Sequence, residues 1–273
     1  MTRFPPHADR RPCVVTGASS GIGRATAHTL AAGGHPVVLG ARRLDRCREV
    51  AGQITAAGGE AHAFALDLTD ARTIESFVAR ATGAVGDVEV LASCAGRNLP
   101  DATASGGAEG FGASLAVNLV GPHLLVDLLA PAMVERRRGD LVFVSSEVAR
   151  WPRPGTKAYV ASKWGLEGYV RTLQMELEGT GVRASIVRPS QTFSEMGSDW
   201  DPTVTTEILG TWMRWGLARH DHFLTPEAVA AAVAAVVETP RGTHLSLIEV
   251  QPEAPVARPP SPTGSSSPTG GVP

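Results

Sequence analysis

The chain has few cysteines, and those few are scattered. Among its 273 residues only Cys13, Cys47 and Cys94 carry a thiol, and no two of them form a CxxC pair. Three widely spaced cysteines argue against a disulfide framework and against a structural zinc site. We therefore expect a reduced, cytoplasmic setting and no bound metal.

The sequence also lacks a long apolar run and an excess of charge. No stretch reaches the roughly 18 uninterrupted apolar residues of a membrane span. Residues 1–11 contain arginines but not the apolar segment of a secretory signal. The formal net charge is −2 at pH 7, so no overall field favours nucleic acid. We expect a small-molecule substrate and neither a membrane nor a nucleic-acid partner.

Short apolar runs alternate with longer amphipathic stretches along most of the chain. The expected strands are residues 13–16, 36–41, 61–66, 88–93, 140–145, 182–188 and 243–250. The expected helices are residues 22–32, 44–57, 71–81, a stretch through 118 to 137, 156–178 and 226–238. Strands rich in Val, Leu and Ala throughout are typical of a parallel sheet that helices cover on both faces. The alternation predicts an α/β fold with a doubly wound sheet in a single domain, residues 12–251.

The two ends of the chain differ from this pattern. Residues 1–11 are expected to be a flexible N-terminus. Residues 252–273 are rich in Pro, Ser, Thr and Gly and poor in apolar side chains. Such a composition does not repay its ordering entropy, so we expect a disordered tail, with a partner-binding arm as the alternative.

A glycine-rich turn, Thr16-Gly17-Ala18-Ser19-Ser20-Gly21-Ile22-Gly23, separates the first expected strand from the first expected helix. The first glycine permits a sharp turn, the second a close approach of backbone to a pyrophosphate, and the third close packing of helix on strand. The helix start offers unpaired N–H groups to phosphate, and the two serine hydroxyls add donors. A tight turn without ligand is the alternative, but the flanking strand and helix favour a dinucleotide site.

The end of the second strand carries Arg42 and Arg43 where an NAD site would have an acidic residue. Two guanidinium groups suit a 2′-phosphate through charge-assisted hydrogen bonds. NADP(H) is therefore the expected cofactor. The alternative is a pair of solvated cations, although a cationic helix start is unfavourable against the helix dipole.

Tyr159 and Lys163 are the clearest candidates for a catalytic pair. The chain holds only two tyrosines and two lysines, and one of each stands four residues apart near the start of an expected helix. That spacing places both side chains on one face. An ammonium beside a phenol favours the phenolate, so Lys163 should lower the pKa of Tyr159. An alcohol–carbonyl redox step needs such a group, because it moves a proton as well as a hydride. A half-buried tyrosine beside a surface lysine is the structural alternative.

Two further polar residues occur at positions where ligands bind in open α/β sheets. Ser146 follows the fifth expected strand, and ligands bind outside the carboxyl ends of strands. Its distance along the chain from Tyr159 allows the loop to bring its hydroxyl back beside the phenol. Asn118 lies inside a helical stretch, where it either forms a kink or holds a water; its spacing does not decide between the two.

Together these residues resemble the short-chain dehydrogenase/reductase family. The resemblance covers about residues 12–250 and includes the glycine turn, Asp67-Leu68, Asn118, Ser146 and the Tyr-x-x-x-Lys pair. It implies a Rossmann-type sheet of about seven parallel strands. It also implies a homodimer or homotetramer built on the long helices around the fifth strand.

The resemblance implies a role for each matching residue. Tyr159 would be the general acid/base, Lys163 would lower its pKa and bind the nicotinamide ribose, and Ser146 would orient and polarise the carbonyl. Asn118 would hold a water in a proton relay through Lys163, and Asp67 would contact the adenine. The expected cofactor contacts are Gly17, Ser19, Ser20, Gly21, Ile22, Gly23, Arg42, Arg43, Asp67, Leu68, Cys94, Ala95, Gly96, Asn118, Tyr159, Lys163, Pro189 and Thr192.

Three positions depart from the family's pattern. Ser93-Cys94 stands where the family has Asn-Asn before Ala-Gly, so a brace of the sheet is lost. Ser190 replaces the glycine after Pro189, so Thr192 or Ser194 would have to supply the hydroxyl near the nicotinamide. Glu147 and Arg150 follow Ser146 where small residues are common; they either alter the mouth of the pocket or pair on the surface.

Residues 190–223 should form a lid over the substrate. Three of the chain's 5 tryptophans fall here, which suits a bulky or apolar carbonyl compound, with Trp200 as a substrate contact. Packing on the body or on another subunit is the alternative. The expected function is an NADP(H)-dependent oxidoreductase that acts on a carbonyl or secondary alcohol. A non-catalytic NADP-sensing regulator on the same fold is the second hypothesis; a methyltransferase would not need the Tyr–Lys pair.

Overall fold

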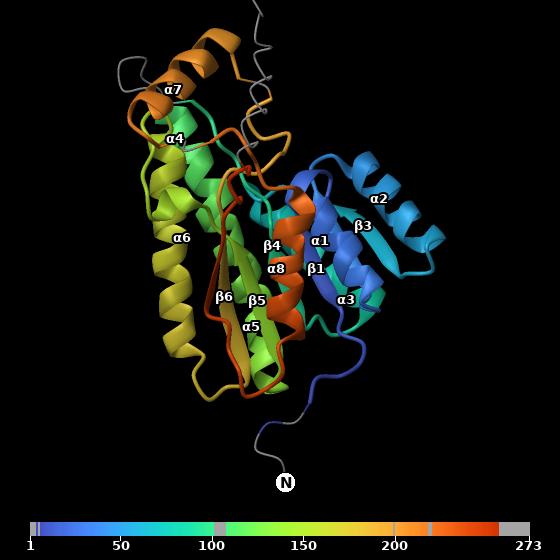
Figure 1. Cartoon of the computed structure of the whole chain (residues 1–273). Helices are drawn as coiled ribbons and strands as arrows, with labels where there is room; N and C mark the ends of the chain where they lie inside the picture. Colours follow the sequence, from blue (N-terminus) through green and yellow to red (C-terminus); the bar gives the residue numbers. More distant parts are fainter. Residues whose placement is uncertain (1–3, 5, 101–107, 199, 218–219, 257–273) are drawn as a thin grey trace, which may run out of the picture.

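A seven-stranded sheet forms the centre of the molecule (Figure 1). The computed structural model describes residues 4, 6–100, 108–198, 200–217 and 220–256. Every pairing between the named strands is parallel, and the strand order is β3-β2-β1-β4-β5-β6-β7. The strands are β1 Cys13–Thr16, β2 Val37–Ala41, β3 Ala61–Ala65, β4 Val90–Ser93, β5 Gly139–Val144, β6 Val182–Pro189 and β7 Leu247–Val250. The expected doubly wound, Rossmann-type α/β fold is confirmed.

Helices cover both faces of this sheet (Figure 1). The α-helices are α1 Gly21–Ala32, α2 Leu44–Ala56, α3 Ala71–Val85, α4 Ala108–Leu115, α5 Gly121–Glu135, α6 Lys157–Glu176, α7 Pro202–Arg214 and α8 Pro226–Glu238. One apolar core joins the sheet to α3, α5 and α6, and includes Phe77, Leu125 and Val170. A second core joins its other face to α1, α2 and α8. Because both faces are buried, the inner strands are apolar along their whole length.

Helices α4 and α5 continue into each other through a short π-helical segment, Ala116–Val120. The combined helix, Gly110–Glu135, is long and apolar enough to cross a membrane by length and composition alone, and 39% of its most apolar window is buried. It contains Asn118, which is fully buried beside polar partners, and it packs against α3 and α6. We interpret it as a core helix of the α/β fold, which is apolar because it lies between the sheet and its neighbours.

The sequence analysis missed one helix and misplaced several ends. Helix α7 lies within the stretch expected only as a lid, and α3 runs four residues further than expected, to Val85. The last strand begins at Leu247 rather than at residue 243. Its partner strand β6 reaches it only through Ile186–Pro189, so the residues before Leu247 have no ladder partner.

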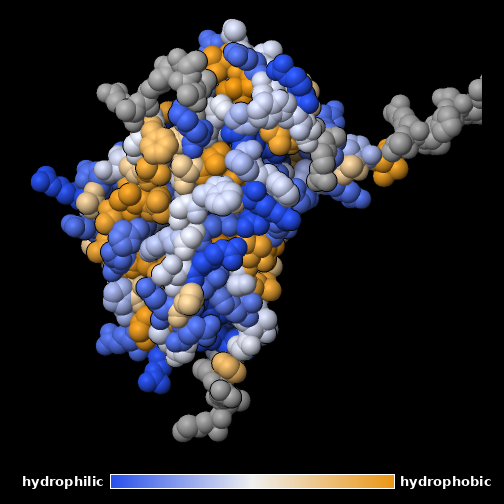
Figure 2. Space-filling model, turned by 90° about the vertical axis from the view of Figure 1, so that its left-hand side faces the viewer, coloured by the Kyte–Doolittle hydropathy of each residue, from blue (hydrophilic) through white to orange (hydrophobic). Residues whose placement is uncertain are grey.

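Apolar side chains reach the surface on the side of the molecule that carries α6 (Figure 2). The large exposed hydrophobic residues of the π-helical segment, α5 and α6 are Val120, Leu128, Trp164 and Met175. Others lie on the lid, including Phe193, Met213 and Trp215, each more than 60% exposed. Large apolar side chains are therefore exposed on two separate parts of the surface, one on α5 and α6 and the other on the lid.

Candidate active site

A cleft of about 490 Å³ opens at the carboxyl ends of the central strands. The strand order reverses between β1 and β4, and parallel sheets bind ligands at this switch point. The cleft is lined by the loops that follow β1, β2, β3, β4 and β6. The residues expected to contact a cofactor that do line it are Gly17, Ser19, Ser20, Gly21, Ile22, Gly23, Arg42, Arg43, Asp67, Leu68, Cys94, Ala95 and Gly96.

The glycine turn has the shape that a phosphate-binding loop needs. Gly17 has φ +68°, and a Cβ there would lie 2.8 Å from the Ala95 Cα. A Cβ on Gly23 would lie 2.4 Å from the Gly17 carbonyl oxygen. Both positions therefore require glycine, one for its backbone angle and both for close packing. Helix α1 starts at Gly21 and directs its free N–H groups into the cleft mouth.

Arg43 links the end of β2 to the glycine turn. Its guanidinium donates hydrogen bonds to the Ser19 Oγ at 3.0 Å and to the Ser20 Oγ at 2.8 Å. Arg42 lines the same part of the cleft and helps to lower the pKa of Asp67, after the larger effect of the Thr69 hydrogen bonds. Guanidinium and hydroxyl donors thus gather where a ribose phosphate would lie.

Of the expected catalytic residues, Asn118 and Lys163 lie beside Gly96, at the opposite end of the cleft from Arg42 and Arg43. A Cβ on Gly96 would lie 3.7 Å from the Asn118 Oδ1 and 3.9 Å from the Lys163 Nζ. The Lys163 ammonium lies 5.8 Å from the Tyr159 ring centroid and donates to the Val144 carbonyl at 2.8 Å. Ser146 follows β5 and forms a hydrogen bond with the Tyr159 side chain. Helix α6 and the β5 loop therefore hold the three groups on one side of the cleft end.

The pKa of Tyr159 does not move in the expected direction. Burial of the phenol raises it, the Ser146 hydrogen bond lowers it, and the negative charge of Glu147 raises it. The prediction that the pKa of Tyr159 is lowered is wrong, because burial of the phenol is the largest effect and raises it. Burial also lowers the pKa of Lys163 to about 8, against smaller opposing effects of Cys94 and Glu167.

Asn118 is a structural brace in this conformation. Its Oδ1 accepts from the Arg97 N–H at 2.7 Å, and its Nδ2 donates to the Arg97 carbonyl at 2.8 Å and to the Ser162 Oγ at 2.9 Å. Both amide hydrogens are thus used within the protein. The side chain ties the loop after β4 to α6, next to the catalytic pair.

Besides the catalytic residues Asn118, Ser146, Tyr159 and Lys163, three expected contacts are not among the residues that line the cleft: Thr192, Pro189 and Trp200. Thr192 donates its hydroxyl to the Ser190 carbonyl at 2.9 Å, and the neighbouring Ser194 lines the cleft in its place. Pro189 ends β6, paired with Val250. The Trp200 indole N–H donates to the Asn98 carbonyl at 3.1 Å, which ties the lid to the loop after β4. Thr192 therefore stays a predicted cofactor contact, and Ser194, the other candidate for the hydroxyl near the nicotinamide, is the one that lines the cleft.

The sequence analysis left the roles of Glu147 and Arg150 open and did not predict Glu195. Glu147 is buried, accepts from the Ser190 Oγ at 2.6 Å and pairs with the buried Arg153, whereas Arg150 forms an exposed pair with Glu249. The loop after β6 supplies Glu195 and Met196 to the cleft. No local sequence pattern predicts these contacts, because most of them join segments that are far apart in the sequence. The described residues contain no group of three or more His, Cys, Asp or Glu side chains that could hold a metal ion.

The cleft lies at the switch point of a parallel sheet and is lined by a glycine-rich turn, and a tyrosine, a lysine and a serine lie next to it. This combination is typical of nucleotide-dependent oxidoreductases. Residues 12–205 match the short chain dehydrogenase family, and the chain belongs to it. A short chain dehydrogenase of Pseudocercospora fijiensis is 34% identical over 201 residues, which are 73% of this chain and 65% of that protein. The chain thus spans slightly less than two thirds of this relative's length.

Solved structures show the same architecture. A metagenomic short-chain oxidoreductase in complex with NADP is 32% identical, with a TM-score of 0.75, over 89% of this chain and 98% of the other. A short chain dehydrogenase/reductase of Burkholderia phymatum in complex with NAD has a TM-score of 0.77 at 23% identity, over 91% and 90% of the two chains. The second likeness shows the fold alone. Neighbours of this chain thus bind either nicotinamide cofactor.

Proposed function

We propose that this protein is an NADP(H)-dependent oxidoreductase that interconverts a carbonyl compound and a secondary alcohol. The observation that carries the proposal is the grouping of Lys163, Tyr159 and Ser146 next to the cleft. The Lys163 ammonium lies beside Gly96 of the cleft wall and 5.8 Å from the Tyr159 ring centroid, while Arg42 and Arg43 line the other end of the cleft. A bound nicotinamide supplies or accepts the hydride. The residues of this chain then have to orient the substrate oxygen and handle its proton.

Each catalytic side chain has a part that follows from its position. In the protein alone the Ser146 hydroxyl bonds to the Tyr159 phenol. With substrate bound, each hydroxyl is proposed to turn its single hydrogen toward the carbonyl oxygen, which then accepts two hydrogen bonds. Tyr159 gives that oxygen a proton during reduction and takes it back during oxidation. The Lys163 ammonium, nearly fully buried, stabilises the negative charge that develops on the phenol.

Asn118 contributes through its backbone on this proposal. Pro122, four residues further on, has no amide hydrogen, so it cannot give the Asn118 carbonyl its usual helical partner. The π-helical segment accommodates this interruption. With its side-chain amide hydrogens already used, Asn118 is proposed to hold a relay water through this carbonyl, next to Lys163.

The donor set favours NADP(H) over NAD(H). Arg42, Arg43, Ser19 and Ser20 line the cleft at the end of β2, and the strand itself ends without a carboxylate. Charge-assisted bonds from guanidinium groups suit a phosphate, whereas a ribose hydroxyl calls for an acceptor.

The substrate and the assembly are proposed from the apolar surfaces. The indole N–H groups of Trp200 and Trp212 bind backbone carbonyls, so these two rings pack the lid on the body. Phe193, Met213 and Trp215 stay exposed, and they favour a bulky, apolar substrate. Leu128 on α5 and Trp164 on α6 are exposed, and they favour a second copy packed against these two helices.

Replacement of Tyr159 by phenylalanine tests the catalytic proposal. Tyr159→Phe keeps the ring and its packing but removes the proton, so turnover should fall by about 100-fold or more. Binding of NADPH, followed by quenching of protein fluorescence, should stay within about twofold of the wild type. Turnover is measured on a panel of ketones and alcohols by the absorbance of the reduced cofactor.

Tyr169→Phe is the matched control. Tyr169 is the only other tyrosine, stands on the same helix and contacts His123 instead of the cleft. Its loss should leave turnover unchanged. If Tyr159→Phe were as active as Tyr169→Phe, Tyr159 would not be the acid/base. If the wild type bound NADPH but turned over no member of the panel, the NADP-sensing regulator would be favoured.

A further inference from the structure

The loop after β6 carries a carboxylate that binds two arginines across the cleft mouth. Glu195 accepts from the Arg43 Nη1 through Oε2 at 2.6 Å and from the Arg46 Nη1 through Oε1 at 2.5 Å. All three side chains are about half exposed. The two ion pairs join segments about 150 residues apart in the sequence, so they fix the loop against the start of α2.

The same loop follows the cleft along its length. Ser194 lies over the glycine turn, where its Cβ would be 3.3 Å from a Cβ on Gly21. The Met196 methyl group would lie 3.3 Å from a Cβ on Gly96, at the catalytic end. Glu195 therefore anchors a segment that touches both ends of the cleft, and we name residues 191–198 the clasp loop.

The guanidinium that Glu195 holds belongs to the proposed 2′-phosphate site. Arg43 also donates to Ser19 and Ser20, so the hydrogen-bond donors of its guanidinium are already engaged by the clasp loop and the glycine turn. Hydrogen bonds from Arg43 and then from Arg46 keep the pKa of Glu195 below its usual range, which keeps this carboxylate ionised. A phosphate monoester carries about −1.5 to −2 charges at neutral pH, so it competes with a single carboxylate for the same donors and repels it.

We propose that Glu195 is a cofactor-specificity residue that occupies Arg43 and Arg46 as an internal anion until a 2′-phosphate displaces it. This inference rests on the proposed NADP(H) preference. It makes the carboxylate a competitor that every 2′-phosphorylated nucleotide must expel. It also makes release of the clasp loop a consequence of phosphate binding, because Glu195 is what holds that loop to α2.

Two nucleotides that differ only in the phosphate at issue test the competition. Adenosine 2′,5′-bisphosphate and adenosine 5′-monophosphate are titrated into the full chain by calorimetry. Glu195→Gln keeps the shape but removes the charge, so it should bind the bisphosphate about 3- to 10-fold more tightly, as expected for loss of two exposed ion pairs. Binding of the monophosphate should change by less than about twofold.

Asp45→Asn is the matched control, since it also removes one negative charge at the start of α2. Asp45 is 92% exposed on its side chain and pairs with Arg48, one turn further along α2. It should leave both affinities unchanged. An equal gain in Asp45→Asn would reduce the effect to general charge and overturn the competition. Weaker monophosphate binding in Glu195→Gln would mean that the carboxylate serves a ribose hydroxyl, which also overturns it.

Arg42→Ala separates this inference from the proposed function. Arg42 lines the cleft, and Glu195 binds Arg43 and Arg46. If Arg42→Ala weakens the bisphosphate alone while Glu195→Gln changes nothing, the NADP(H) site stands and the competitor does not. If neither variant discriminates between the two nucleotides, the NADP(H) preference itself fails.

Hydrogen exchange of the free protein gives a readout without ligand. Peptides that cover residues 191–198 should exchange faster in Glu195→Gln than in the wild type, because the bonds that anchor the clasp loop are weakened. The Asp45→Asn protein should match the wild type. Unchanged exchange in Glu195→Gln would show that this carboxylate does not hold the loop.

Discussion

Burial in the fold lowers the pKa of Lys163 into the range where activity is measured. The residue is 3% exposed, and its ammonium donates a hydrogen bond to the Val144 carbonyl at the end of β5. Burial lowers its pKa to about 8, so the group is charged below that pH and loses its proton above it. The charge that is to stabilise a phenolate on Tyr159 is therefore present at neutral pH and lost in mild alkali.

This ionisation predicts the alkaline side of the pH profile. In the reduction direction kcat/KM, which reports groups of the free enzyme, should fall above about pH 8. Burial raises the pKa of Cys94 to about 12 and raises that of Tyr159, so neither group titrates near pH 8. In Lys163→Arg the guanidinium stays protonated, so the fall should move to much higher pH even though turnover is reduced. A fall at pH 8 that persists in Lys163→Arg would assign it to another group.

At the scale of single residues, the sequence was a better guide to which residues belong to the site than to how buried each of them is. The Tyr159–Lys163 spacing and the glycine turn are local patterns; in the structure the glycine turn lines the cleft, and the Lys163 ammonium lies beside Gly96 of the cleft wall. The pKa of Tyr159 was predicted to fall because the sequence shows the neighbouring cation but not the burial that opposes it. Glu195 was missed because its two partners lie about 150 residues away, and only the folded chain brings them together.

At the scale of elements, helix α7 is tied to the catalytic loop by a buried acid. Glu147, next to Ser146, pairs with Arg153, and Arg153 donates to the Leu217 carbonyl at 2.6 Å. The Arg153 guanidinium also lies 5.0 Å from the Trp212 ring centroid on α7. The sequence showed a lid but not this helix, because its packing depends on a charge pair whose burial has no local signature.

Neutralisation of Glu147 should loosen this connection. Glu147→Gln leaves the Arg153 guanidinium buried without its counter-ion, which should cost about 1–3 kcal/mol of stability. Loss of the negative charge should also let the pKa of Tyr159 fall, since that charge helps to raise it. Chemical denaturation measures the first effect, and the pH dependence of kcat measures the second.

Arg150→Gln is the control for Glu147→Gln. Arg150 pairs with Glu249 but is 53% exposed on its side chain, so its loss should cost less than about 0.5 kcal/mol. Equal losses from the two variants would show that burial of the Glu147–Arg153 pair has no special weight. If Glu147→Gln lost stability but its pH profile did not shift, Glu147 would stabilise the fold without affecting the pKa of Tyr159.

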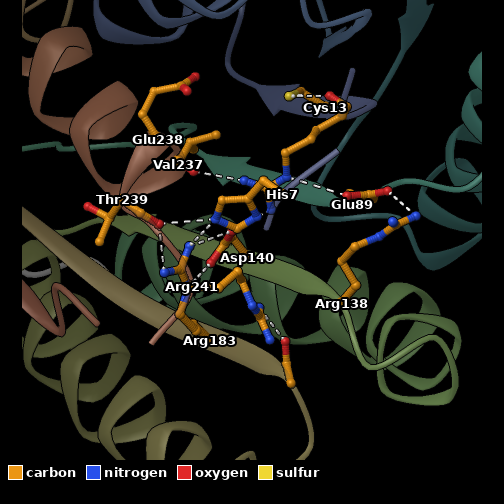
Figure 3. A network of polar contacts seen from close by, with 12 residues as sticks. His7, Cys13, Glu89, Arg138, Asp140, Arg183, Val237, Glu238, Thr239 and Arg241 are labelled. Carbon is orange, nitrogen blue, oxygen red and sulfur yellow. Dashed lines mark hydrogen bonds and ion pairs between the residues drawn. The ribbon is translucent and has the colours of Figure 1, made fainter. Parts of the chain in front are cut away.

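At the scale of the whole molecule, a network of charged side chains joins the amino ends of the central strands, opposite the cleft (Figure 3). Asp140 on β5 accepts from the Arg183 Nε of β6 at 2.6 Å and also pairs with the buried Arg11. Arg11 in turn donates to the Val237 carbonyl of α8 at 2.8 Å. His7 lies between the Thr239 carbonyl, 3.0 Å away, and the Arg183 Nη2, 3.2 Å away. The N-terminal segment, expected to be flexible, is docked here from Pro6 onward among the described residues.

The overall architecture was predictable because it depends on periodic patterns, whereas this network was not. Seven apolar runs with helices between them predict a parallel, doubly wound sheet with right-handed crossovers. Arg11 and Asp140 are 129 positions apart and have no pattern that links them. The network thus joins the N-terminal segment, two strands and α8 into one unit by contacts that only the finished fold contains.

Titration of His7 should make the docking of the N-terminal segment sensitive to acid. Burial, followed by the charge of Arg11, lowers the pKa of His7 below its ordinary 6.5, against opposing effects of the Thr239 carbonyl and Asp140. The unfolded chain therefore binds this proton first as the pH falls, so stability is lost below about pH 6.5. Because His7 is partly exposed, the loss should stay below about 1 kcal/mol. Chemical denaturation at pH 7.5 and 5.5 measures it, and His7→Gln should lose less stability than the wild type between the two values. Since the comparison subtracts every other histidine, an equal loss in both proteins would show that His7 is protonated as readily in the fold as in the unfolded chain.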